Sequence, residues 1–339
     1  MKYLAAFFCL WTFCACGDNR PLEEIISLPN TDSQEPRVAA VLKSARAGVE
    51  AERSNVNAWR HLGAVLDAHR FTSAAESAYR EALSLNADDP WTCYQLAITL
   101  EMMSKEPEET LKLLAIAGAG YPKLPFPLIH TGRVLDAQGD SLGARDAYLS
   151  AVKIDGRQAL LRRALGQVYL DLGANEEAIE QLERAVGLAS KTDGPTWAAL
   201  AQGYERTGAA EKAQRARELA ANNGNTLISA DPLRRAVSTL GVSSKIALER
   251  GMGRMSAGDF QGAVADLEIA GELRPRDPWL QLRLATCFQE LRNPSHAAEH
   301  LKLAESARSE LFGPSSKDDL VEFDAALKRY QNKFLARGN

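Results

Sequence analysis

Apolar residues recur along this chain at the three- and four-residue spacing of helices, and the pattern itself repeats. One unit consists of Trp59, Leu62, Gly63 and Leu66, followed by Ala75, Tyr79 and Ala82. The same order of large and small residues returns about every 34 residues, which leaves room for two helices joined by a turn. A chain of 339 residues could form two globular domains, but this periodicity predicts one all-α array instead.

Small residues recur at set positions in each unit. A glycine on the first predicted helix is followed by an alanine on the second, as in Gly132 with Ala144 and Gly166 with Ala178. Residues without bulk let paired helices approach closely. A further glycine, such as Gly173, ends the first helix because glycine accepts the left-handed conformation at low cost. Seven units can be read over residues 57–305, two of them weaker than the rest.

This spacing resembles the tetratricopeptide repeat family, and the resemblance covers about three quarters of the chain. It implies a right-handed superhelical solenoid of helix-turn-helix repeats. Capping helices are expected at both ends because an open array must cover its terminal faces. The predicted order is a capping helix at 37–56, repeats 1–5 at 57–220, an insertion at 221–244, repeats 6–7 at 245–305 and a capping helix at 306–339.

The first fifteen residues predict an export signal. Lys2 precedes an uncharged, mostly apolar run that ends at Ala15 and is too short to span a bilayer, which takes about 20 residues. The run ends in Phe13-Cys14-Ala15-Cys16-Gly17, which resembles the bacterial lipoprotein cleavage box and implies that Cys16 is lipidated. The alternative is an ordinary signal-peptidase site at Ala15-Cys16-Gly17, which would release a soluble protein. Residues 16–36 are then expected to form a flexible tether.

Composition and motifs exclude several function classes. A net charge of -4, from 40 basic and 44 acidic residues, provides no broad positive field for nucleic acid. His296 and His300 lie four positions apart without a third ligand in view, so a solvated helix face is expected there and no metal site. Cys93 and Cys287 are expected to be buried as small apolar residues. Because no catalytic or phosphate-binding motif occurs, we predict no enzyme activity and no cofactor.

In the tetratricopeptide repeat family, the first helix of each pair lines a concave binding face. Carrying those positions over residue by residue places on this face Arg60, Trp91, Tyr94, Phe126, His130, Arg133, Arg163, Trp279 and Arg283. A mixture of aromatic and arginine side chains suits peptide capture. The alternative is that Trp91, Phe126 and Trp279 pack between neighbouring helix pairs. The insertion at 231–237 is the next candidate surface.

These features together predict a non-catalytic protein-protein interaction scaffold. It would be exported, anchored to a membrane through an N-terminal lipid, and act as an adaptor for a protein or peptide partner in the cell envelope. Its expected location is the outer membrane or the periplasmic face rather than the cytoplasm. The alternative function is an exported accessory of an enzyme or a cofactor-carrying protein, such as a helper of a respiratory or haem-containing complex, with the array as scaffold.

Overall fold

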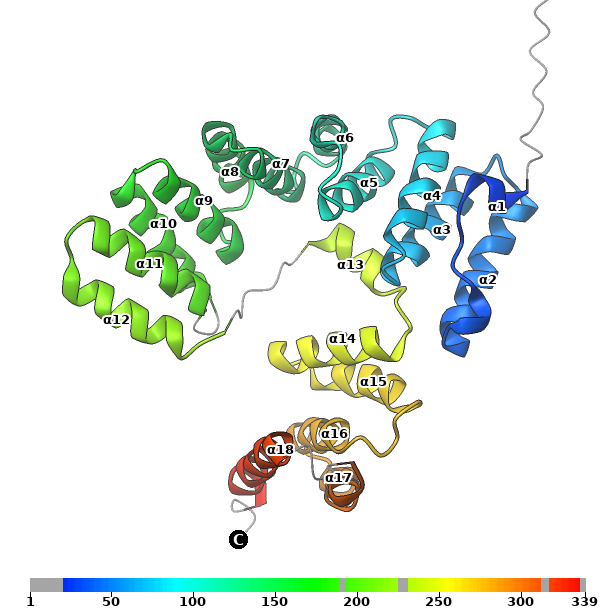
Figure 1. Cartoon of the computed structure of the whole chain (residues 1–339), viewed down its shortest axis with the longest axis vertical. Helices are drawn as coiled ribbons and strands as arrows, with labels where there is room; N and C mark the ends of the chain where they lie inside the picture. Colours follow the sequence, from blue (N-terminus) through cyan, green and yellow to red (C-terminus); the bar gives the residue numbers. More distant parts are fainter. Residues whose placement is uncertain (1–20, 190–192, 225–230, 312–316, 336–339) are drawn as a thin grey trace, which may run out of the picture. The chain divides into compact units, whose positions relative to one another are not determined.

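The computed structural model describes residues 21–189, 193–224, 231–311 and 317–335. Over these residues every regular element is helical, and consecutive helices pack as antiparallel pairs that stack on their neighbours (Figure 1). The all-α solenoid predicted from the repeat spacing is therefore confirmed. The predicted signal at 1–15 and Cys16 lie outside the described residues. No helix in the described part of the chain is both long and apolar enough to cross a membrane.

The described residues form two compact units. The first comprises 21–29, 44–67, 71–189, 193–224 and 231–235, and the second comprises 30–43, 68–70, 236–311 and 317–335. The pairs of the first unit are α3 (Val56–Ala68) with α4 (Thr72–Leu85), α5 (Pro90–Met102) with α6 (Pro107–Gly120), α7 (Phe126–Ala137) with α8 (Ser141–Ile154), α9 (Ala159–Asp171) with α10 (Asn175–Leu188), and α11 (Gly194–Arg206) with α12 (Ala210–Ala221).

The second unit contains two further pairs and the C-terminal helix. These are α14 (Ser244–Ala257) with α15 (Phe260–Gly271), α16 (Pro278–Glu290) with α17 (Pro294–Leu311), then α18 (Lys317–Tyr330) and the π-helical turn η2 (Gln331–Leu335). The elements α1 (Leu22–Ile25), η1 (Thr31–Ser33) and α2 (Pro36–Ala51) precede the pairs, and α13 (Pro232–Ser238) lies in the predicted insertion.

The paired helices are held close together by glycine on the first helix and a large side chain on the second. A Cβ atom built on the glycine would lie 2.6 Å from the Tyr79 ring at Gly63, 2.5 Å from the Tyr148 ring at Gly132, and 2.5 Å from Leu182 Cγ at Gly166. Real Cβ atoms do not approach other heavy atoms this closely, so these positions exclude any larger residue without a shift. The large side chain that covers each glycine is itself buried.

The turn inside most pairs uses glycine with a positive φ. Gly139, Gly173, Gly208 and Gly258 have φ between 75° and 82°. In the last pair Arg292 takes this role with φ 58°, a conformation that a side chain disfavours.

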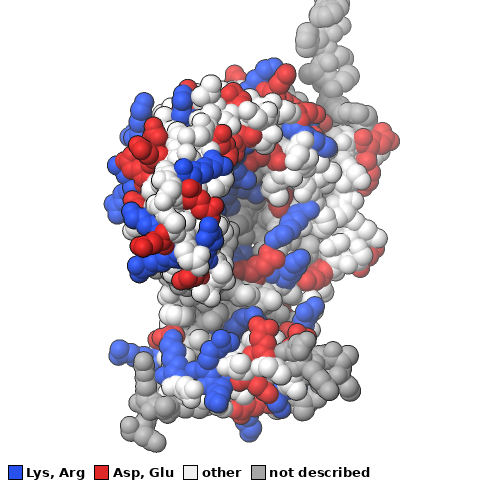
Figure 2. Space-filling model, turned by 60° about the vertical axis from the view of Figure 1, so that its left-hand side comes forward, with Lys and Arg blue, Asp and Glu red and all other residues white. Residues whose placement is uncertain are grey.

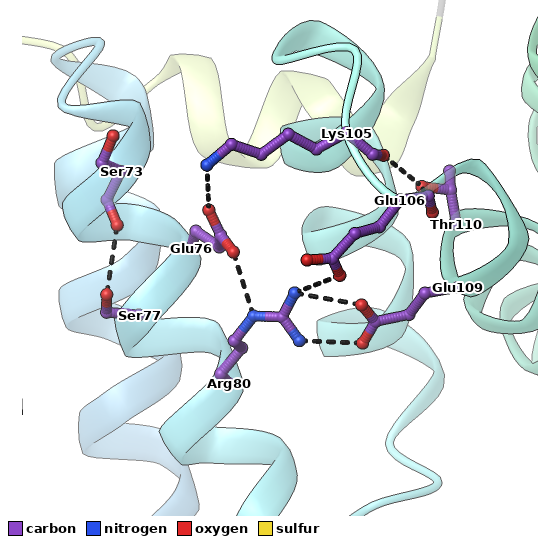
Figure 3. Close-up of polar contacts among 8 residues, drawn as sticks. All are labelled: Ser73, Glu76, Ser77, Arg80, Lys105, Glu106, Glu109 and Thr110. Carbon is purple, nitrogen blue, oxygen red and sulfur yellow. Dashed lines mark hydrogen bonds and ion pairs between the residues drawn. The ribbon is translucent and has the colours of Figure 1, made fainter.

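An ion-pair network joins the second helices of the first two pairs (Figure 3). Arg80 on α4 donates to Glu76 at 3.0 Å, to Glu106 at 2.8 Å and to both carboxylate oxygens of Glu109, at 2.8 and 3.0 Å. Lys105 also bonds Glu76, at 3.4 Å. The hydrogen bonds with Glu109 are the largest cause that raises the pKa of Arg80. This forked arrangement fixes α6 against α4 more specifically than a single exposed pair could.

The two ends of the array differ from the boundaries predicted from sequence. Within the predicted tether at 16–36, α1 and η1 are ordered elements, and Leu22 and Ile26 are buried. From residue 21 onward the chain therefore differs from the predicted flexible tether, because the apolar residues Leu22 and Ile26 are buried. The N-terminal capping helix is α2, which ends at Ala51 rather than at 56. At the other end, the second helix of the last pair continues to Leu311, beyond the predicted boundary at 305.

The glycine contacts generate a stability prediction. Gly166→Ala should lower the free energy of unfolding by about 1–3 kcal/mol, because the added Cβ would overpack the contact with Leu182. Gly187→Ala on the neighbouring α10 is the control, since a Cβ atom added there would have no neighbour within 4 Å and alanine favours helix. Urea denaturation followed by circular dichroism measures both. Equal stability of the two variants would contradict the close crossing at Gly166.

Candidate functional site

The structure sorts the nine residues predicted to line a binding face by their burial. Tyr94, Phe126 and His130 are buried; Arg60, Trp91, Arg163, Trp279 and Arg283 are half-buried; Arg133 is exposed. In this structure Tyr94, Phe126 and His130 are therefore covered by other parts of the chain. This differs from the predicted open face, because the helical period assigns a face of the helix but not what covers that face.

Tyr94 is covered by the chain's own insertion. Its hydroxyl donates to Asp231 Oδ2 at 2.5 Å, and the neighbouring Gln95 donates from Nε2 to the Leu233 carbonyl at 3.2 Å. Asp231 is itself buried and holds α13 in shape: its Oδ1 accepts the Leu233 N–H at 2.9 Å, and its carbonyl accepts the Arg235 N–H at 3.0 Å. One carboxylate therefore both caps the short helix and fixes it to α5.

Arg234 makes the second set of contacts, between α13 and the first helices of the first two pairs. Its guanidinium is bidentate to Asp67 on α3, with Nη1 2.6 Å from Oδ2 and Nη2 3.1 Å from Oδ1. Nη1 also donates to Gln95 Oε1 on α5 at 2.7 Å. Planar, charge-assisted pairs of this kind are both strong and geometrically selective. Residues 231–235 thus lie against the same helices that were predicted to bind a peptide, beside α3 and α5 in Figure 1.

The environment of this contact favours the ion pair and keeps the tyrosines protonated. Burial lowers the pKa of Arg234, but its hydrogen bonds and charge attraction with Asp67 outweigh this and raise the pKa overall. Burial, and then the negative charge of Asp67, raises the pKa of Tyr79, whose hydroxyl lies 3.4 Å from Asp67 Oδ2. Burial and Asp231 do the same for Tyr94. At neutral pH both phenols are therefore hydrogen-bond donors to carboxylates.

The remaining predicted residues of the first unit are also engaged with neighbouring pairs. Arg60 stacks over the Trp91 ring at 4.7 Å, which favours the alternative in which Trp91 packs between pairs. Glu101 on α5 holds two residues of α7, His130 at 2.6 Å and Arg133 at 3.0 Å.

Arg163 on α9 follows the same pattern. It lies 2.9 Å from Asp193, the N-cap of α11. Ion pairs therefore link α5 with α7 and α9 with α11 in this unit.

The second unit has an open cavity of about 280 Å³ between α16, α18 and η2. It is lined by Trp279, Leu282, Arg283, Thr286, Ala326, Arg329, Tyr330, Lys333 and Phe334. Trp279 meets the buried Phe323 edge-on at 5.2 Å, and Arg283 lies 5.7 Å above the Trp279 ring. Both residues predicted from sequence in this unit, Trp279 and Arg283, thus line one cavity together with residues of the segment that was predicted to cap the array.

Positive charge is in excess around this cavity. Lys333 pairs with Glu290 at 2.6 Å, whereas Arg283 and Arg329 form no ion pair with any carboxylate in the described part of the chain. Burial lowers the pKa of Arg283 although Asp277 acts in the opposite direction. Figure 2 shows one face of the molecule, on which acidic and basic side chains are interspersed. A half-buried arginine without a carboxylate favours a ligand that supplies one.

The cysteines and histidines discussed in the sequence analysis differ in their burial. Cys93 and Cys287 are free, buried thiols, and burial raises the pKa of each to about 11. His300 is not on a solvated face as expected: it is half-buried, stacks on Phe288 at 5.2 Å and lies 2.6 Å from Gln281 Oε1 through Nδ1. His296 is exposed. Within the described residues, no group of three or more His, Cys, Asp or Glu side chains is placed to hold a metal ion.

Stacked helical pairs, several of them with a glycine at the crossing, define a helical repeat scaffold. The family model for the tetratricopeptide repeat matches residues 164–192, which include most of α9 and all of α10. The matched segment corresponds to one helix pair, and the match agrees with the residue spacing there. No curated protein sequence matches the chain.

Several solved structures share part of the fold. The crystal structure of MamA protein is 18% identical, with a TM-score of 0.46, and the match covers 49% of this chain and 90% of MamA. For YrrB, a tetratricopeptide repeat protein with an unusual peptide-binding site, the identity is 15%, the TM-score 0.47 and the coverage 53% and 92%. For a tetratricopeptide repeat protein from Parabacteroides merdae ATCC 43184 these values are 14%, 0.47, 74% and 92%. Similarity at this level transfers no function to this chain.

The contact between Tyr94 and Asp231 generates the second prediction. Tyr94→Phe should lower the free energy of unfolding by about 1–3 kcal/mol, because it removes a hydrogen bond to a buried carboxylate and leaves that oxygen without its donor. Tyr169→Phe on α9 is the matched control, since the Tyr169 hydroxyl has no hydrogen-bond partner among the described residues. Chemical denaturation compares the two variants. A loss no greater than that of the control would show that the bond contributes nothing.

Proposed function

We propose that this chain is a non-catalytic scaffold that is exported, anchored to a membrane by a lipid on Cys16, and binds a protein of the cell envelope through its second unit. The observation that carries the binding role is the cavity between α16 and α18. It combines an aromatic wall with two arginines that have no carboxylate partner in the described chain. In the first unit the predicted binding residues are already engaged, so this cavity is the better site.

The chemistry of the cavity indicates the kind of segment it would accept. A volume of about 280 Å³ suits one or two side chains rather than a folded surface. Trp279 and Phe334 provide apolar contact, and Arg283 and Arg329 provide forked donors for a carboxylate. A peptide segment with an acidic group next to an apolar side chain satisfies both requirements. Such a segment would neutralise the positive excess around the cavity.

The proposed anchor is supported by sequence alone. The apolar run before Cys16 is the length of a signal segment, and Ala15-Cys16 is the pair that the lipoprotein box requires. Because α1 begins at Leu22, only residues 16–21 separate the proposed lipid from the first ordered helix. The adaptor would then be held near the membrane rather than on a long tether.

The anchor is tested by mass spectrometry of the mature N-terminus in a bacterial host that processes lipoproteins. The membrane fraction should contain an acylated peptide that begins at Cys16, and Cys16→Ser should abolish both acylation and membrane attachment. Cys14→Ser is the control and should leave processing unchanged. An unmodified mature chain beginning at Asp18 would refute lipidation and favour ordinary signal-peptidase cleavage.

The binding site is tested with a photo-crosslinking residue at Thr286, which lines the cavity, and at the exposed Glu299 on α17 as the positional control. The Thr286 position should capture a defined envelope protein that the Glu299 position does not. Arg283→Gln with Arg329→Gln should reduce this capture at least tenfold, since truncating an arginine anchor typically costs about 2 kcal/mol. The exposed Arg274→Gln is the control for lost charge. Equal capture by both variants would exclude the cavity as the binding site.

A further inference from the structure

The first unit already contains a bound segment, in the form of residues 231–235. These residues reach Asp67 across 167 positions of sequence and Tyr94 across 137. The contacts are made by side chains with directional hydrogen bonds, and three of them converge on Arg234. A segment held in this way resembles a ligand in a recognition site more than a connecting loop.

The receiving surface is specific for a cation. Asp67 on α3 is buried, and the Tyr79 hydroxyl beside it does not neutralise its charge. Removing Arg234 would leave this buried carboxylate without its cation, which is strongly unfavourable. The planar guanidinium also bonds Gln95 while it is bidentate to Asp67, which an ammonium group could not reproduce.

The bound segment is itself weakly held apart from these contacts. The helix α13 has seven residues, and a helix of this length is not stable alone in water. Pro232 is exposed, and Leu233 is half-buried. Asp231 and Arg234, a capping carboxylate and an arginine three positions later, bond to α3 and α5 through their side chains, and Gln95 bonds to the Leu233 carbonyl.

We propose that the face of α3 and α5 that carries Asp67 and Gln95, here called the inner face, is a second binding site. Its ligand is a protein helix that begins with Asp and has Arg three positions later. Residues 231–235 are an internal occupant that such a partner displaces. The site uses none of the residues that line the cavity of the second unit. The proposal for this site can therefore be refuted without refuting the function proposed for the cavity, and the reverse also holds. The internal occupant sets the affinity that a partner needs in order to bind, because a tethered segment competes at an effective concentration of about millimolar.

The test uses a fluorescein-labelled peptide with the sequence of residues 231–238, Asp-Pro-Leu-Arg-Arg-Ala-Val-Ser, acetylated and amidated at its ends. Its affinity is measured by fluorescence anisotropy for the full wild-type chain, for Arg234→Ala, and for Arg215→Ala, an exposed arginine on α12 that serves as the control. The peptide should bind Arg234→Ala at least tenfold more tightly than the wild type, since the internal competitor is weakened. Arg215→Ala should behave as wild type.

Further variants make the result specific to the site. Adding Asp67→Asn to Arg234→Ala should reduce peptide binding at least tenfold, and a peptide with Lys in place of its first Arg should bind more weakly than the parent. Asp231→Asn provides a second way to weaken the internal segment if Arg234→Ala does not fold, as judged by circular dichroism. Equal affinity of the peptide for wild type and for the folded variants, or an affinity that does not depend on Asp67, would overturn the proposal.

Discussion

The close crossing of two helices at a glycine is the constraint on which the rest of this structure depends. At Gly63, Gly132 and Gly166 the first helix of a pair presents bare backbone, and a tyrosine or leucine from the second helix lies directly on it. The pair thereby buries its large residues without leaving a void. With the interior of each pair filled, the outward side of the first helix is left for contacts with neighbouring pairs or with other chains.

The two units use this available surface differently. In the first unit, charged residues on the first helices are matched within the chain, as Asp67 is by Arg234 and Glu101 by His130 and Arg133. Such internal pairing orders the inner face but leaves little unmet hydrogen-bonding capacity for an external partner. In the second unit, Arg283 and Arg329 remain without a carboxylate in the described chain, beside aromatic side chains. A half-buried arginine without a carboxylate, as Arg283 is, favours a ligand that supplies one.

Folding of the short helix α13 and its docking against α5 depend on the same side chain. Asp231 caps the helix with one carboxylate oxygen and accepts the Tyr94 hydroxyl with the other, so local folding and docking are coupled through a single side chain. Because neither the helix nor the contact is stable alone, the two form together. Coupling of this kind makes the occupancy of the inner face depend on a few polar contacts rather than on a large apolar area.

The repeat, the all-α class and the glycine crossings were determined by the sequence itself, because local spacing sets which residues share a helix face and small residues mark where helices meet. The pairing of Gly166 with the second helix needed only this information. Tertiary structure decided which of the predicted face residues are free. Tyr94 and Arg283 occupy equivalent faces by period, yet one is covered by Asp231 and the other lines an open cavity. The helical period cannot predict a contact between residues 137 positions apart. Such a contact depends on the path of the intervening chain, and that path is fixed in the folded protein by the pairing of buried charges.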